Sequence, residues 1–169
     1  SGQADLAIGT THDSNTAPDV HTKPLGQVSF VYAVAPHHPL ASAPEPLGDS
    51  LIQQHRAVAV ADTVAGQRGL SFNLLSGQPV FTVASMHDKL EAQLRGLGAG
   101  FVPECLASGY LETGRLRAKR VKRPEQLAPL SYAWRGAAKS GEGRALKWWL
   151  QRLESPATRT ALLDGRRGV

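Results

Sequence analysis

The sequence predicts an α/β fold, and three features of the chain support this. Residues 28–35 form an almost continuously apolar, β-rich run, which is typical of a strand covered on both faces of a sheet. A second β-rich run at 78–84 leads directly into a helix start, and another strand follows that helix at 99–102. This order indicates βαβ units, so we expect a parallel sheet. With 169 residues, of which 41% are apolar, the chain can fill the core of one domain or of two small lobes.

Turn residues separate the strands expected in the first third of the chain. A short strand at 4–8 ends at a Gly-Thr turn, and the polar residues 10–24 are expected to form a loop. The strand at 28–35 stops at the Pro-His-His-Pro sequence of 36–39, because proline removes a backbone donor and restricts the residue before it. Residues 41–50, rich in proline, serine and alanine, are expected to be a surface connection.

The clearest local signal is the helix start that follows the strand at 78–84. Ser85 has the N-cap position, and Asp88, three residues later, has the capping-box position. Gly96 and Gly98 are expected to end this helix and reverse the chain. The remaining expected strands are 56–61, 99–102, 116–121 and 130–134, and the remaining expected helices are 103–111, 141–153 and 156–163.

Composition and charge exclude several classes of protein. The formal net charge is +5, but the basic residues are concentrated in the last third of the chain, and aromatic residues make up only 6%. We therefore expect the basic run at 115–123 to be a solvated strand and turn and not a nucleic-acid surface. No apolar run approaches the roughly 20 residues that span a bilayer, so no membrane contact is expected. The single cysteine, Cys105, excludes an intramolecular disulfide and indicates a reducing, cytoplasmic setting.

The residues that could carry catalysis or bind a metal ion do not form a recognisable motif. His37 and His38 are adjacent, so their side chains point apart in an extended chain, and we expect a solvated turn there. Cys105 is expected to be a small buried apolar residue in a helix and not a nucleophile. No metal-ligand, nucleophile-elbow or phosphate-loop spacing occurs. The sequence therefore predicts no enzyme activity, no cofactor and no metal site.

The feature with ligand-binding chemistry is the strand-to-helix junction at 83–87. A capped helix that starts at a strand end directs backbone N–H groups and a partial positive charge outward, which suits carboxylates and other polar groups. Ligands of open α/β sheets collect at the carboxyl ends of strands. A purely structural cap is the alternative role for the serine of this junction. The residues expected at strand ends are Thr10, Asp62, Thr63, Ser85 and Met86, together with the end of the strand at 99–102.

Four motifs occur in a fixed order along the chain. They are G-Q-A-D-L-A-I-G at 2–9, F-V-Y-A-V-A-P-H-H-P-L-A at 30–41, L-R-G-L-G-A-G-F-V-P at 94–103 and L-E-T-G-R-L at 111–116. Each motif alone is modest, whereas the ordered set is specific. Together they resemble the effector-binding (substrate-binding) domain of LysR-type transcriptional regulators, and the strand and helix at 130–153 fit that family's return to its first lobe.

The resemblance implies a two-lobed, periplasmic-binding-protein-like (type 2) fold with hinge crossover strands and an effector cleft between the lobes. Residues 1–35 and 130–169 then form the first lobe, and residues 36–129 form the second. The family's winged helix-turn-helix, and the first strand and helix of its first lobe, have no counterpart here. We therefore expect an incomplete first lobe that is either loosened or completed by a second copy at the strand 4–8. Motif by motif, the family's effector contacts map to Ser85 and Met86, with Asp62, Thr63 and Phe101 as neighbours.

The function that the resemblance implies is small-molecule sensing in the cytoplasm. The effector is expected to be an uncharged or singly anionic aromatic molecule. By changing the lobe angle or the contacts of a homo-oligomer, it would alter DNA binding by the absent N-terminal domain. The alternative is a solute-binding protein of a transporter with the same fold, which would need an export signal. An enzyme on this scaffold would need an acid–base constellation that the sequence lacks.

Overall fold

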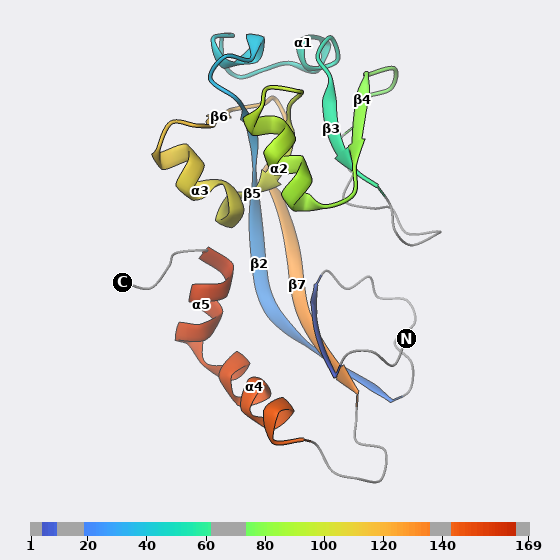
Figure 1. Ribbon diagram of the computed structural model, residues 1–169, viewed down its shortest axis with the longest axis vertical. Helices are drawn as coiled ribbons and strands as arrows, with labels where there is room; N and C mark the ends of the chain where they lie inside the picture. The colour runs from blue at the N-terminus through green and yellow to red at the C-terminus, as the bar shows by residue number, and fades with distance from the viewer. Residues whose placement is uncertain (1–4, 10–18, 62–73, 136–142, 165–169) are drawn as a thin grey trace. The chain divides into compact units, whose positions relative to one another are not determined.

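The computed structural model describes residues 5–9, 19–61, 74–135 and 143–164 (Figure 1). It is a mixed α/β structure that divides into two compact units, residues 1–29 with 127–169 and residues 30–126. The predicted α/β class is therefore confirmed. The lobe boundaries expected from the sequence stay a prediction.

The first unit combines a small sheet with two C-terminal helices. Its elements are β1 (Leu6–Gly9), β2 (Val20–Val34, which continues into the second unit), β7 (Gln126–Arg135), α4 (Arg144–Glu154) and α5 (Pro156–Asp164). β1 pairs antiparallel with β7, with Leu6 opposite Trp134, and β7 also neighbours β2. Leu25, Tyr132 and Leu153 come from β2, β7 and α4 and are buried together. This apolar contact holds α4 on the sheet.

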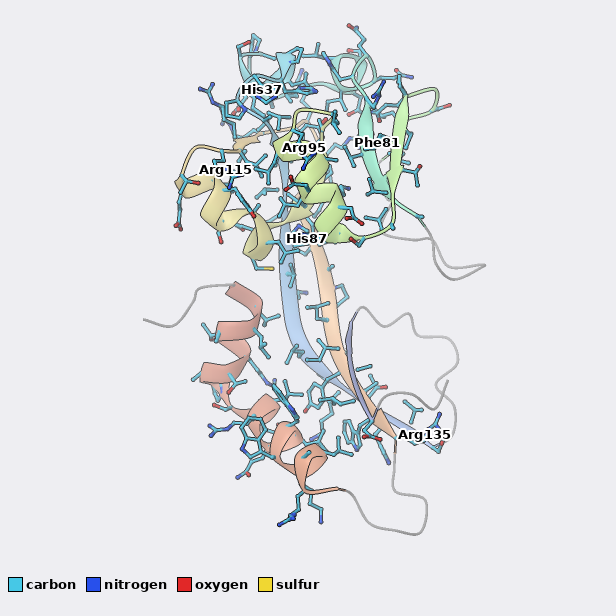
Figure 2. The ribbon with its side chains drawn as sticks, in the orientation of Figure 1. His37, Phe81, His87, Arg95, Arg115 and Arg135 are labelled. Carbon is cyan, nitrogen blue, oxygen red and sulfur yellow. The ribbon has the colours of Figure 1, made fainter. Side chains whose placement is uncertain are left out.

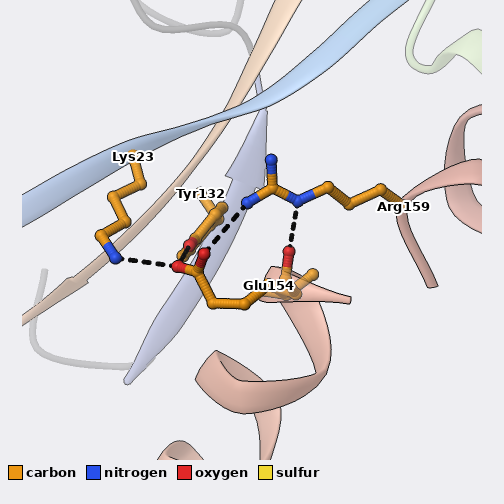
Figure 3. Close-up of polar contacts among 5 residues, drawn as sticks. Lys23, Tyr132, Glu154 and Arg159 are labelled. Atoms are coloured by element: carbon orange, nitrogen blue, oxygen red, sulfur yellow. Dashed lines mark hydrogen bonds and ion pairs between the residues drawn. The ribbon is translucent and has the colours of Figure 1, made fainter. Parts of the chain in front are cut away.

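Glu154 connects the two helices of this unit to the sheet (Figure 3). Its carboxylate accepts a hydrogen bond from the Tyr132 hydroxyl at 2.6 Å and another from the Lys23 ammonium at 2.8 Å. Arg159 of α5 reaches the same carboxylate at 3.5 Å and also donates to the backbone carbonyl of Leu153. The Lys23 and Tyr132 hydrogen bonds hold the pKa of Glu154 below its usual value. The cluster therefore fixes α4 and α5 through a charged carboxylate.

The second unit contains a βαβ arrangement. Its elements are the end of β2, the 3₁₀ turn η1 (Pro39–Ala41), α1 (Asp49–Ile52), β3 (Ala57–Val60), β4 (Val80–Val83), α2 (Met86–Leu94), β5 (Gly100–Pro103), α3 (Glu104–Glu112) and β6 (Arg117–Lys119). β3 and β4 pair in parallel, and Ala57 also forms a parallel bridge with Ala99. α2 carries the chain between these two partners of β3 and packs on β3, β4 and β5. Leu90, Val102 and Leu116 belong to the core beneath α2 and α3.

Two glycines shape the return after α2, as the sequence predicts. Gly96 has φ +72°, and a Cβ atom there would collide with the ring of His37. A Cβ atom on Gly98 would lie 2.6 Å from the backbone oxygen of Arg56. Figure 2 labels His37 and Arg95, and the His37 Nε2 atom lies 3.4 Å from the Arg95 carbonyl oxygen. Only glycine allows the chain to pass this closely after the helix.

The pairing directions correct the expectation of a parallel sheet. Among the described strands, the parallel ladder is that of β3 with β4, whereas β2 pairs antiparallel with both β5 and β6. The expected loop at 10–24 is also wrong at its end, because β2 already begins at Val20. His21, Thr22 and Lys23 make this stretch polar, but it still continues the strand. Apolar patterning indicates strands without indicating the direction of their partners.

The expected surface connection at 41–50 is partly buried. Leu47 is fully buried, and its backbone exchanges hydrogen bonds of 2.8 Å with Arg120 and Lys122. The basic run at 115–123 is accordingly not wholly solvated. The Lys119 ammonium, with its side chain 8% exposed, pairs with Glu45 at 3.0 Å and donates to the carbonyl of Ala43 at 2.9 Å. The Lys119 side chain and the backbone of Arg120 and Lys122 hold the connection in place, while other side chains of the run remain exposed.

β1 has a single partner strand in the part of the chain that the structure describes. It pairs with β7, and its other edge carries no ladder. Leu6 packs partly against the core of the unit, whereas Ile8 is 46% exposed. Among the described strands, β1 is therefore an edge strand, as expected. Its completion by a second copy stays a prediction.

Candidate functional site

The junction between β4 and α2 has the local geometry that the sequence predicts. Ser85 has extended backbone angles, and its hydroxyl oxygen accepts the N–H of Asp88 at 3.1 Å. The same hydroxyl donates to the Asp88 carboxylate at 2.7 Å. The predicted N-cap is therefore confirmed. In this variant of the capping box, the Asp88 carboxylate accepts a hydrogen bond from the cap's hydroxyl.

The structure describes two of the other predicted site residues, Met86 and Phe101. Met86 opens α2, but its side chain packs against the core beneath α2 and α3. Phe101 is buried in β5 and meets Tyr32 edge to face at a ring distance of 5.3 Å. Thr10, Asp62 and Thr63 lie outside the described residues.

A cavity lies beneath α2, between β3, β5 and the end of β2. Its atom-free space is about 320 Å³, part of which is open solvent. Phe101 lines it, whereas Ser85 and Met86 are not among its described lining residues. The walls are mostly apolar, with Gln78 and Lys89 as the polar contributions. The described lining residues are Tyr32, Ile52, Ala57, Val58, Ala59, Leu74, Gln78, Lys89, Ala99, Gly100 and Phe101.

Lys89 and Gln93 are the functional candidates that sequence reasoning missed. Lys89 is 5% exposed, and burial lowers the pKa of its ammonium to about 8. Gln93 is fully buried, and both of its amide atoms lack a hydrogen-bond partner among the described residues. The spacing of Met86 and Leu90 would have placed position 93 on the same inward face of the helix. That spacing was the available signal.

Gln78, in contrast, is buried and fully satisfied. Its amide nitrogen donates to the carbonyls of Ile52 at 3.1 Å and His55 at 2.9 Å, and its amide oxygen accepts the N–H of Leu75 at 3.2 Å. These bonds close the start of β4 onto α1. Gln78 therefore serves the fold.

The histidine pair is structural in part, which corrects the expectation of a solvated turn. His38 is 7% exposed, and its Nδ1 atom accepts the N–H of Leu40 at 3.2 Å, so its ring caps η1. Burial and the nearby rings of His55 and His37 lower the pKa of His38. Cys105 is half-buried, less than expected. Within the described ranges, no group of three or more His, Cys, Asp or Glu residues could hold a metal ion.

Known proteins match most of this chain. The family described as the LysR substrate binding domain matches residues 1–156. The HTH-type transcriptional regulator YeeY of Escherichia coli (strain K12) is 36% identical over 148 residues, which cover 88% of this chain and 47% of that protein. The chain thus spans about half the length of the curated relatives it matches.

Solved structures show the same fold. The regulatory domain of MetR, a LysR family regulator from N. meningitidis, aligns with a TM-score of 0.63 at 18% identity, covering 95% of this chain and 72% of that one. The effector binding domain of QuiR in complex with shikimate aligns with a TM-score of 0.62 at 20% identity, covering 87% and 68%. None of the helices in the described part of the chain is long and apolar enough to cross a membrane. The chain belongs to the LysR substrate-binding domain family, the effector-binding domains of LysR-type transcriptional regulators.

Proposed function

We propose that this domain senses a small aromatic molecule, uncharged or singly anionic, and thereby controls DNA binding by the rest of a longer regulator. The proposal rests on one observation: Ser85 caps the N-terminus of α2, and the same helix lines the cavity beside Phe101. Membership of the LysR substrate-binding domain family supports it.

The start of α2 supplies the recognition chemistry in this proposal. The first N–H groups of a helix have no partner within the helix, and they carry a partial positive charge. Ser85 fixes the direction of these N–H groups, because its hydroxyl accepts the Asp88 N–H and donates to the Asp88 carboxylate. Phe101 and Tyr32 supply an aromatic wall below the same helix. We also propose Met86, Thr10, Asp62 and Thr63 as effector contacts.

The remaining parts of the proposal concern the longer protein. A helix-turn-helix outside this chain would contact DNA, and copies of the regulator would associate in the cytoplasm. The effector acts only if it binds one arrangement of the oligomer more tightly than another, because equal affinity for both shifts nothing. That shikimate is bound in the QuiR structure supports an effector of this size.

A binding screen on the longer protein tests the function. Small aromatic acids and phenols are screened by thermal shift, and each hit is added to the protein on its promoter DNA while fluorescence anisotropy reports affinity. We expect at least one hit to change DNA affinity, and Ser85→Ala to weaken that response by more than its loss of stability explains. Ser42→Ala, at an exposed serine, is the matched control. An unchanged DNA affinity with every hit, or an unchanged response in Ser85→Ala, would contradict the proposal.

A further inference from the structure

Two buried polar side chains beneath α2 have no partner among the described residues. Gln93 is 0% exposed, and neither of its amide atoms has a hydrogen-bond partner in the described part of the chain. Lys89 is 5% exposed, and burial lowers its pKa, with no compensating acid among the described residues. An unpaired buried polar group is costly, and a charged one more so. Each such group in a native structure therefore needs an explanation.

Lys89 lines the cavity, and both side chains lie close to Gly100, which lines it as well. They lie one helical turn apart on α2, and Ser85 precedes Lys89 by another turn on the same face. A Cβ atom placed on Gly100 would lie 3.1 Å from the Gln93 amide nitrogen and 3.5 Å from the Lys89 Cε atom. A side chain at position 100 would therefore contact both the Gln93 amide and the Lys89 stem.

The size and lining of the cavity limit what can enter it. The centre of a water-sized atom can occupy about 20 Å³ of this cavity, so it has room for one or two such atoms. A carboxylate group presents two oxygen atoms of that size and a single negative charge. Its oxygens can accept from both an ammonium and an amide N–H. A neutral head group would leave the ammonium unpaired, and the described lining supplies no second cation for a dianion.

We propose that the cavity beneath α2 takes the carboxylate group of a monocarboxylate effector, with Lys89 as its counter-ion and the Gln93 amide as a second donor. The inference rests on the proposed function, because it assigns the anionic end of the molecule whose aromatic body contacts the start of α2. Phe101 and Tyr32 then cover the apolar part next to the carboxylate. The ligand supplies the partners that the described residues do not provide.

Calorimetric titration of the 169-residue chain with sodium acetate, sodium benzoate and neutral benzamide tests this. We expect both carboxylates to bind at pH 7 and benzamide to bind at least tenfold more weakly than benzoate. Lys89→Met should weaken benzoate at least tenfold, and Gln93→Leu about threefold. Both substitutions remove buried polar groups without shortening the side chain much, and unfolding curves of each variant confirm that it is folded. Lys147→Met, at an exposed lysine of α4, should bind benzoate as the unchanged chain does.

The pH profile is a second readout. Benzoate affinity should fall as the pH rises above about 8, where Lys89 loses its proton, and should not fall in this range for Lys89→Met. The strands packed on α2 are β3, β4 and β5, and they carry no acidic or basic side chain. The helix α3, which shares the apolar core with α2, carries Glu104, Cys105, Tyr110 and Glu112. Tyr32 is the other titratable side chain of the described lining, and burial raises its pKa further above this range.

Several outcomes overturn the inference: neither carboxylate binds, benzamide binds as tightly as benzoate, or Lys89→Met binds benzoate unchanged. The failure of the proposed function looks different. If benzoate binding depends on Lys89 but no small molecule changes DNA affinity of the longer protein, the carboxylate site stands without the sensing role. If a neutral effector acts through Ser85 while carboxylates do not bind, sensing stands and the carboxylate site is wrong.

Discussion

Lys89→Met should stabilise the unliganded domain, although it alters a buried residue of the core helix. The pKa of Lys89 falls from 10.5 to about 8 because the ammonium is buried. One pKa unit corresponds to about 1.4 kcal/mol, so keeping Lys89 charged at pH 7 costs the fold roughly 3 kcal/mol. Methionine keeps an unbranched apolar stem of similar length without the charge. We expect the free energy of unfolding to rise by about 1–3 kcal/mol at pH 7.

The sign of the pH dependence follows from the depressed pKa. Below about pH 8, Lys89 is protonated in the folded and unfolded chains, so the full cost is present. Between about 8 and 10.5, the unfolded chain binds more protons than the folded one, so the stability of the unchanged protein rises with pH. Lys89→Met lacks this rise. The stability difference between the two proteins should therefore shrink from pH 7 towards pH 10.

Urea unfolding followed by circular dichroism, at pH 7, 8, 9 and 10, measures this difference. The ionisation of Tyr32 and other groups occurs in both proteins and cancels in the comparison. Lys147→Met is the control, with a change within about 0.5 kcal/mol expected at an exposed position. If Lys89→Met lowers the stability at pH 7, or if the difference is the same at every pH, the ammonium is not an uncompensated buried charge.

Three further substitutions test other contacts of the structure. Ser85→Ala should lower the free energy of unfolding by about 1 kcal/mol, while Ser85→Asp should keep most of it, because aspartate also caps; equal losses in both would argue against capping. Tyr132→Phe should cost about 1 kcal/mol through the hydrogen bond lost to Glu154 and should raise the pKa of that carboxyl, which an NMR titration detects. An unchanged pKa of Glu154 would mean that the Tyr132 hydroxyl does not donate to it in solution. Gly98→Ala should destabilise the domain strongly, because its Cβ atom would lie 2.6 Å from a backbone oxygen, whereas Gly109→Ala, with open space in α3, should stabilise by about 0.5–1 kcal/mol. If Gly98→Ala does not lower the thermal unfolding temperature, residue 98 lies farther from the Arg56 backbone oxygen than in this structure.

Features that depend on neighbours in the chain were predictable from the sequence. The Ser85 cap, the end of α2 before Gly96 and the strand before the Pro-His-His-Pro turn all rest on contacts within a few residues. The βαβ order around α2 was predictable for the same reason. Family membership followed from the spacing of four short motifs, and the match over residues 1–156 confirms it.

Only part of the candidate site was predictable from the sequence. Phe101 and the start of α2 follow from strand-end and helix-start patterns, which sequence displays directly. Lys89 and Gln93 carry residue types that usually face solvent. Their burial depends on β3 and β5 covering that face of α2, and those strands come from positions distant in the sequence.

The sequence by itself determined where α2 begins and ends and where β2 stops, because caps, glycine turns and prolines act on their own few residues. Only the tertiary structure decided that β2 pairs antiparallel with β5 and β6, and that Leu47, His38 and Lys119 are enclosed. The reason is physical: backbone pairing and burial are contacts between distant segments, and the composition of one segment does not specify its partner. The same packing leaves Lys89 and Gln93 inside without partners in the described chain.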